Sequence, residues 1–136
     1  MFRITFTAIL IFFKLHRSTC SRIFKSLLSI LVSNTKSFIF WPSKQTIIST
    51  LPMTFKLHYS NCRAIIDCTE IKTEQPPKVN QRVFMYSNYK STYTCKFLIV
   101  IAPNGMITFF ISKPYGGRSS DSFITNDSGF LNLLEP

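Results

Sequence analysis

The sequence predicts a mixed α/β fold, in which a helical N-terminal segment is followed by strands and a helix in the order β-β-β-α. Apolar residues recur at helical spacing through residues 18–32, which indicates an amphipathic helix. Residues 64–66 form an apolar run that is long enough for a buried strand and too short for a buried helix. Two β-rich runs flank Pro103-Asn104-Gly105, and Asn-Gly is a strong signal for a tight turn between antiparallel strands.

Charge is distributed unevenly along the chain, whose formal net charge is +10. Residues 1–66 hold nine lysines and arginines and no acidic residue, whereas residues 67–136 are close to neutral. An excess of positive charge favours polyanionic partners, with nucleic acid first and an anionic membrane surface second. The basic half therefore predicts contacts to a phosphate backbone.

The four cysteines, at 20, 62, 68 and 95, contain no C-x-x-C pair. In a strand, Cys62 and Cys68 would stand roughly 20 Å apart at about 3.3 Å per residue. They could not share a zinc ion, and a disulfide needs Cα atoms closer than about 7 Å. We therefore expect free thiols in a reducing compartment.

An apolar stretch, residues 4–13, follows Arg3 near the N-terminus. It is too short to span a bilayer, which needs about 20 residues, and we expect it to form a core helix. The alternative is a signal peptide over residues 1–17, because a basic start followed by an apolar region has that outline. In that case the protein would be secreted.

Residues 18–60 are expected to form helices that are joined by a connector. Ser18 or Ser21 can cap the amphipathic helix, and its polar face carries Arg22 and Lys25, which are candidates for phosphate contacts. After the connector, Ser43 is expected to cap a short helix, and Pro52 suits the first turn of another. The single tryptophan, at position 41, is expected to anchor packing rather than to stack on bases.

The strand expected over 63–68 ends on Asp67, the first acidic residue of the chain. A carboxylate at the tip of a buried strand is costly unless a cation or hydrogen bonds meet it. Asp67 is therefore a candidate metal ligand or catalytic group, with a structural turn or cap as the alternative. Residues 70–81 are expected to form a polar loop, and 87–91 a turn that carries Lys90, the basic residue nearest to Asp67 in that turn.

The C-terminal part begins with a hairpin, formed by runs at 92–101 and 106–112 beside the first strand. Gly116-Gly117 is expected to be a flexible loop. Ser119 or Ser120 opens a helix to about position 125, and residues 130–134 form a last amphipathic turn. Asp121 lies at the start of that helix, where a capping or indirect role is expected ahead of metal ligation.

Ordered motifs along the chain resemble one protein family. They read FWPS at 40–43, CRAIIDCTEI at 62–71, YSNYK at 86–90, APNG at 102–105, GGRSSD at 116–121 and SGFLNLLEP at 128–136. In this order and spacing they resemble the DDE-superfamily transposases of the PIF/Harbinger type, over about residues 18–136. STCSRIF at 18–24 resembles the end of the helix-turn-helix that precedes the nuclease in this family.

The resemblance implies a fold, an activity and a cofactor. It divides the chain into a basic helical segment with a degenerate helix-turn-helix, residues 1–60, and a partial endonuclease domain, residues 61–136, which is the truncated opening half of an RNase H-like fold. Such nucleases hold two divalent cations, Mg²⁺ or Mn²⁺, on three carboxylates and cleave DNA or transfer its strands. Asp67 matches the first carboxylate, and the other two are expected beyond residue 136. We therefore expect a nuclear, DNA-binding protein without a small-molecule cofactor and without nuclease activity from this chain alone. A non-catalytic nucleic-acid-binding module is the alternative.

Overall fold

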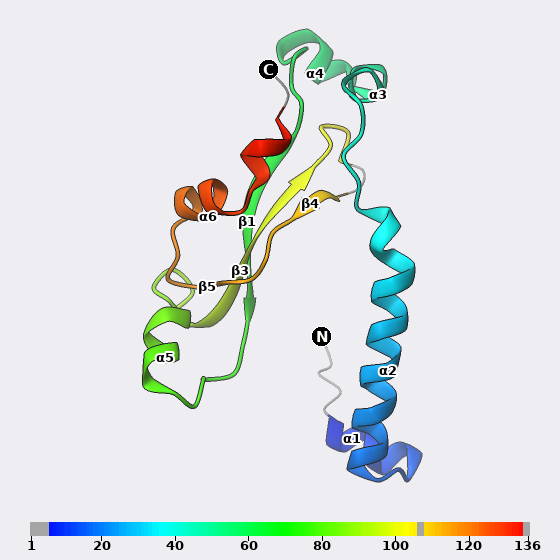
Figure 1. Cartoon of the computed structure of the whole chain (residues 1–136), viewed down its shortest axis with the longest axis vertical. Coiled ribbons are helices and arrows are strands. Elements are labelled where there is room, and N and C mark those ends of the chain that lie inside the picture. The colour runs from blue at the N-terminus through cyan, green and yellow to red at the C-terminus, as the bar shows by residue number, and fades with distance from the viewer. Residues whose placement is uncertain (1–5, 106–107, 135–136) are drawn as a thin grey trace. The chain divides into compact units, whose positions relative to one another are not determined.

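The computed structural model describes residues 6–105 and 108–134, which fall into two compact units (Figure 1). The first unit ends at Ser37 and the second begins at Phe38. The start of the apolar N-terminal stretch, the first two residues of the expected second hairpin strand and the last two residues of the final motif lie outside the described residues. Among the helices that the structure describes, none is long and apolar enough to cross a membrane.

Helices form the first unit. Helix α1 spans Phe6–Phe13 and α2 spans Arg17–Thr35, and the short 3-10 helix η1, Lys36–Phe38, follows. The helix expected over 18–32 is confirmed, but the expected serine caps are wrong. Because α2 begins at Arg17, Ser18 already lies in its first turn, and the ring of His16 accepts the hydrogen bond from the Ser18 backbone N–H.

Apolar side chains of the first unit remain largely in contact with solvent. Phe12 of α1 and Leu27 of α2 are exposed, whereas Cys20 is buried. The N-terminal stretch therefore forms the expected helix without the expected core position for Phe12. Both Arg22 and Lys25 are exposed on α2.

A sheet built around one long strand organises the second unit. Strand β3, Thr92–Ile101, pairs antiparallel with β1, Ile65–Lys72, from Ile65↔Ile101 to Lys72↔Thr94. Strands β4, Thr108–Ile111, and β5, Tyr115–Gly116, also pair with β3, as does β2, Tyr86–Ser87. Since β3 residues 95–96 and 99–101 pair with both β1 and these later strands, β4 and β5 lie along the opposite edge of β3 from β1 (Figure 1).

The expected hairpin is confirmed by its turn. The Gly105 N–H donates to the Ala102 carbonyl at 2.9 Å, and Gly105 has a φ of +77°, which glycine adopts without steric cost. Strands β3 and β4 pair antiparallel on either side of this turn, as the sequence predicts, and β3 lies between β4 and β1.

Short helices surround the sheet in the second unit. They are α3 (Lys44–Thr50), α4 (Met53–His58), α5 (Val79–Met85), α6 (Asp121–Asp127) and the 3-10 helix η2 (Phe130–Leu133). Ser43 caps α3 as expected, accepting from the Thr46 N–H at 3.2 Å. Pro52 occupies the N-cap of α4 rather than its first turn.

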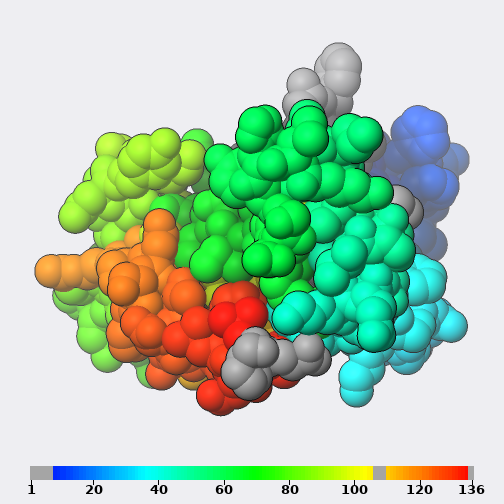
Figure 2. All heavy atoms as spheres, turned by 90° about the horizontal axis from the view of Figure 1, so that it is seen from above, coloured from blue at the N-terminus to red at the C-terminus, as the bar shows by residue number. Residues whose placement is uncertain are grey.

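One face of the sheet carries the core. Leu98 and Val100 of β3 pack with Ile124 of α6 and Phe130 of η2, and all four are buried. Trp41 packs edge-to-face against Phe130 at a centroid distance of 6.1 Å, so its expected role as a packing anchor is confirmed. In Figure 2 the C-terminal segment, drawn in red, lies against the cyan-to-green segment that carries α3 and α4.

The expected bounds of the first strand and of the loop after it are wrong. Strand β1 runs over 65–72 rather than 63–68, because backbone pairing with β3 continues through the polar residues 69–72. Glu70 therefore lies in the strand and not in a loop. Helix α5 begins in the last three residues of the expected loop and continues to Met85. The Arg82 Nε donates to the Pro76 carbonyl at 2.8 Å.

The two glycines at 116–117 are not a flexible loop, because both are buried. Gly116 pairs with Cys95 in the sheet, and the Gly117 N–H donates to the Thr94 carbonyl at 3.1 Å. A Cβ at Gly116 would lie 2.4 Å from the Phe84 side chain. Close approach of α5, rather than flexibility, therefore requires glycine here.

Candidate functional site

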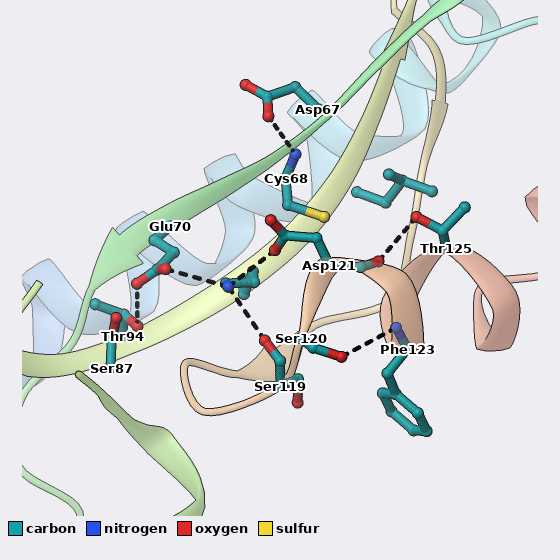
Figure 3. Close-up of polar contacts among 12 residues, drawn as sticks. Asp67, Cys68, Glu70, Ser87, Thr94, Ser119, Ser120, Asp121, Phe123 and Thr125 are labelled. Carbon is teal, nitrogen blue, oxygen red and sulfur yellow. Dashed lines mark hydrogen bonds and ion pairs between the residues drawn. The ribbon is translucent and has the colours of Figure 1, made fainter. Parts of the chain in front are cut away.

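A polar hollow of about 530 Å³ lies along β1. It is lined by Asp67, Cys68, Thr69, Glu70, Tyr89, Lys90, Lys96 and Asp121. Three residues that the sequence predicts for a functional site, namely Asp67, Lys90 and Asp121, belong to this lining, although the Asp67 carboxylate lies on the other side of β1 from Asp121 (Figure 3). The other two, Arg22 and Lys25, belong to the first unit.

Strand alternation separates the acidic side chains of β1. Successive side chains of a strand point to opposite faces, so Asp67 lies on the other face from Cys68 and Glu70. Figure 3 shows the Asp67 carboxylate on one side of the β1 ribbon, and the Glu70 carboxylate on the side that faces Asp121. Asp67 is exposed, and its Oδ1 accepts from the Cys68 backbone N–H at 2.8 Å.

Glu70 is nearly enclosed, with a side chain that is 6% exposed. Thr94 donates to its Oε2 at 2.8 Å, and the Lys96 Nζ lies 3.3 Å from its Oε1. Burial alone would raise the pKa of Glu70, but hydrogen bonds from Ser87, Thr94 and Lys96 outweigh burial and hold the pKa below its usual value. Glu70 is therefore an ionised, fully engaged carboxylate.

Lys96 joins β3 to β1 and to the start of α6. Its side chain is 12% exposed, and its Nζ lies 3.0 Å from Asp121 Oδ1. The same ammonium donates to the Ser119 carbonyl at 3.1 Å. Burial lowers the pKa of Lys96, but the carboxylates of Asp121 and Glu70 outweigh burial and raise the pKa above its usual value.

Asp121 is the first residue of α6, as the sequence predicts for a helix start. Ser120 provides the side-chain cap instead, because its Oγ accepts from the Phe123 N–H at 3.2 Å. The Asp121 side chain is 69% exposed. Burial and then the nearby Asp121 carboxylate raise the pKa of the Cys68 thiol to about 11, which keeps this thiol protonated near neutral pH.

The lack of a side chain at Gly117 leaves space for Thr94, a hydrogen-bond partner of Glu70. A Cβ at Gly117 would lie 2.0 Å from Thr94 Oγ1, the atom that donates to Glu70. The motif at 86–90 contributes Ser87, and the motif at 116–121 contributes the Ser119 carbonyl and the Asp121 carboxylate. Three motifs that lie apart in the sequence therefore meet at the Glu70–Lys96 pair.

Sequence reasoning does not select Glu70 or Lys96 as site residues. For Glu70, which follows Asp67 by three residues, alternation along a continued strand places the side chain on the opposite face and argues against a shared metal site. For Lys96, one signal was available. Lys96 is a lone charged residue in the otherwise uncharged β3, and it shares a strand face with the buried Leu98 and Val100.

Two further lining residues contact each other, since the Lys90 Nζ lies 4.5 Å from the centre of the Tyr89 ring. The Lys90 N–H donates to Ser87 Oγ at 3.2 Å, so the turn that carries Lys90 is fixed to a buried side chain. Both Tyr89 and Lys90 are exposed. The lining therefore includes an exposed cation and an exposed aromatic ring as well as carboxylates.

The described residues fit only part of a metal site. In residues 6–105 and 108–134, no group of three or more His, Cys, Asp or Glu side chains could hold a metal ion. Lys96 already pairs with Glu70 and Asp121, while none of the ion pairs formed by the described residues involves Asp67. Asp67 can therefore supply one carboxylate ligand to a hard cation such as Mg²⁺.

Comparison with known proteins identifies this same part of the chain. The model of a family described as DDE superfamily endonuclease matches residues 66–136. The match begins one residue before Asp67 and includes every residue that lines the polar hollow. No curated protein and no solved structure matches the chain.

Proposed function

The chain belongs to the DDE superfamily endonuclease family, and from this premise we propose that Asp67 is its metal ligand. The protein is then a transposase-derived nuclease domain of the PIF/Harbinger type that binds Mg²⁺ or Mn²⁺ through Asp67. The observation that carries the proposal is the contrast in the hollow, where Asp67 is exposed and outside the ion-pair network while Glu70 and Asp121 are paired with Lys96.

When bound, paired divalent cations in such nucleases clamp the attacking and leaving oxygens of a phosphodiester. In this chain Asp67 supplies a carboxylate to one cation, and Lys90 lies close enough to the hollow to meet a phosphate. A single carboxylate is a poor Mg²⁺ site. We therefore propose weak metal binding, and no DNA cleavage by residues 1–136 alone.

The sheet supports an RNase H-like reading of the second unit. Within the described part of the chain, β1 pairs only with β3. A further strand on the other edge of β1 would satisfy its backbone groups and could bring a second carboxylate beside Asp67. We propose that the complete catalytic site requires such a strand and a third carboxylate.

Manganese titration followed by NMR tests the assignment. We expect paramagnetic broadening of backbone amide signals centred on Asp67, and we expect Asp67→Asn to abolish it. Asp127→Asn is the matched control, because Asp127 is also exposed but pairs with Lys113 outside the hollow. Broadening centred elsewhere, or none at millimolar Mn²⁺, would reject Asp67 as the ligand.

A second candidate function is non-catalytic DNA binding by the basic half of the chain. Residues 1–66 carry no acidic residue, and both Arg22 and Lys25 are exposed on α2. We propose that these two residues, together with Lys90, contact the phosphate backbone, and that the protein acts in the nucleus. Salt-sensitive binding without cleavage in Mg²⁺ or Mn²⁺ would favour this function.

A further inference from the structure

The Lys96 ammonium occupies a cluster of oxygen atoms. It lies 3.3 Å from Glu70 Oε1 and 3.0 Å from Asp121 Oδ1, and it donates to the Ser119 carbonyl at 3.1 Å. Two carboxylates and a carbonyl are the ligand types that hard divalent cations prefer. The Lys96 ammonium already holds a positive charge among these oxygen atoms.

The charges around Lys96 come from two different elements. Glu70 belongs to β1 and Asp121 to α6, and without a cation between them the two carboxylates would repel each other. The Lys96 side chain is 12% exposed and that of Glu70 is 6% exposed, so water screens this cluster poorly. The Asp121 side chain is 69% exposed, so the counter-charge that Lys96 Nζ supplies matters most for the enclosed Glu70 carboxylate.

We propose that Lys96 is a built-in cation that determines where divalent metal binds in the polar hollow. Its ammonium excludes metal from Glu70 and Asp121 and leaves Asp67 as the available carboxylate. The inference rests on the proposed function in that it concerns the same hollow and the same metal. It goes further, because it assigns Lys96 a role in metal placement and Glu70 and Asp121 the role of its counter-ions.

A purely structural role for Lys96 predicts a different result. If Lys96 only ties α6 to β1, its removal changes stability and leaves the position of bound metal unchanged. If Lys96 acts as a built-in cation, removal of its charge opens a new site on Glu70 and Asp121. Metal position, rather than stability, therefore separates the two roles.

The test is titration with Mg²⁺ and, separately, Ca²⁺, with the ¹³C shifts of side-chain carboxylates as the readout. In the natural protein we expect the Asp67 carboxylate signal to move, and those of Glu70 and Asp121 to stay. In Lys96→Met we expect the Glu70 and Asp121 signals to move, with an apparent affinity at least about tenfold tighter than that of Asp67. Lys113→Met is the matched control, because Lys113 forms an ion pair with Asp127 outside the hollow.

Should Lys96→Met be unfolded without metal, circular dichroism provides the second measurement. The inference predicts that either cation refolds the variant, because a ligand that binds only the folded state stabilises it. Failure of both cations to refold it would overturn the inference. So would a folded Lys96→Met in which Glu70 and Asp121 do not respond.

The outcomes also separate this inference from the proposed function. If the Asp67 carboxylate signal does not move in the natural protein but the Glu70 and Asp121 signals move in Lys96→Met, Asp67 is rejected as the ligand and the role of Lys96 is supported. If the Asp67 signal moves in both proteins and the Glu70 and Asp121 signals do not move in Lys96→Met, Asp67 is supported as the ligand and the role of Lys96 is rejected.

Discussion

Asp67 and Glu70 lie three residues apart in one strand and differ in almost every physical respect. Asp67 is exposed, and its Oδ1 accepts from the neighbouring backbone N–H. Glu70 is 6% exposed, accepts from Thr94 and pairs with Lys96. The difference teaches that acidic residues of one motif can serve opposite purposes, one open to a ligand and the other closed by the fold.

A second pair of charges shows why burial matters. Lys113 and Asp127 lie 2.9 Å apart, closer than Lys96 and Glu70, but their side chains are 64% and 43% exposed. Exposed pairs contribute little because water screens them, whereas loss of one partner from a buried pair leaves an uncompensated charge. The Lys96 cluster should therefore matter far more to stability than the Lys113 pair.

The largest expected effect is that of Glu70→Gln on stability. This change leaves Lys96 short of a buried counter-ion, and we expect it to lower the free energy of unfolding by about 3–5 kcal/mol. Asp67→Asn should change it by less than about 0.5 kcal/mol, because an exposed side chain is altered. Urea denaturation of both variants measures the comparison, and equal losses would contradict it.

Gly117→Ala should have the next largest effect. Its Cβ would lie 2.0 Å from Thr94 Oγ1, which disrupts a donor to Glu70, and overpacking of this kind costs about 1–3 kcal/mol. Gly105→Ala is the control, because nothing lies within 4 Å of its Cβ and only the positive φ is strained. If the two variants lose the same stability and the Thr94 hydroxyl still donates to Glu70, the close approach of Gly117 to Thr94 is not needed by the Lys96 cluster.

The pH dependence of stability should follow Glu70. Its pKa in the folded protein is below the ordinary value of 4.5, so its contribution is full above that value and is lost as pH falls through the lowered pKa. The pKa of Lys96 is raised above 10.5, so its contribution is full below that value and is lost as pH rises through the raised pKa. In Glu70→Gln, the loss of stability that Glu70 causes at acid pH should be absent. Urea midpoints of both proteins, measured from about pH 3 to about pH 8, check this.

DNA binding should depend on the first unit and not on the two strand acids. If Arg22 and Lys25 each contact a phosphate, replacing both with alanine should reduce the salt slope of binding by about 1.8. Asp67→Asn and Glu70→Gln, provided they are folded, should leave that slope unchanged. Fluorescence anisotropy at several salt concentrations measures it, and an unaltered slope in the double variant would remove both residues from the interface.

Much of the fold can be predicted from the sequence, because turns and helix starts depend on a few neighbouring residues. The Asn-Gly turn predicts the β3–β4 hairpin, and Ser43 predicts the start of α3. Helix α5 was missed because Pro76-Pro77 indicates a loop, while long-range packing of Phe84 against Gly116 stabilises a helix just after it.

The site was predicted only in part, for a related reason. The position of Asp67 in a strand motif is a local property, and so is that of Asp121 at a helix start. The Lys96 cluster depends on the register that places Glu70 opposite Lys96 and on the approach of α6. Neither is encoded in any one stretch of sequence, so only the folded chain joins the motifs.

The Mn²⁺ affinities of Glu70→Gln and Asp67→Asn decide which of the two carboxylates binds metal. Electron paramagnetic resonance of free Mn²⁺ can measure both, under conditions where circular dichroism shows each variant to be folded. We expect Glu70→Gln to bind Mn²⁺ as the natural protein does and Asp67→Asn to lose binding. Loss of binding in Glu70→Gln, with retention in Asp67→Asn, would contradict this expectation by making Glu70 the ligand.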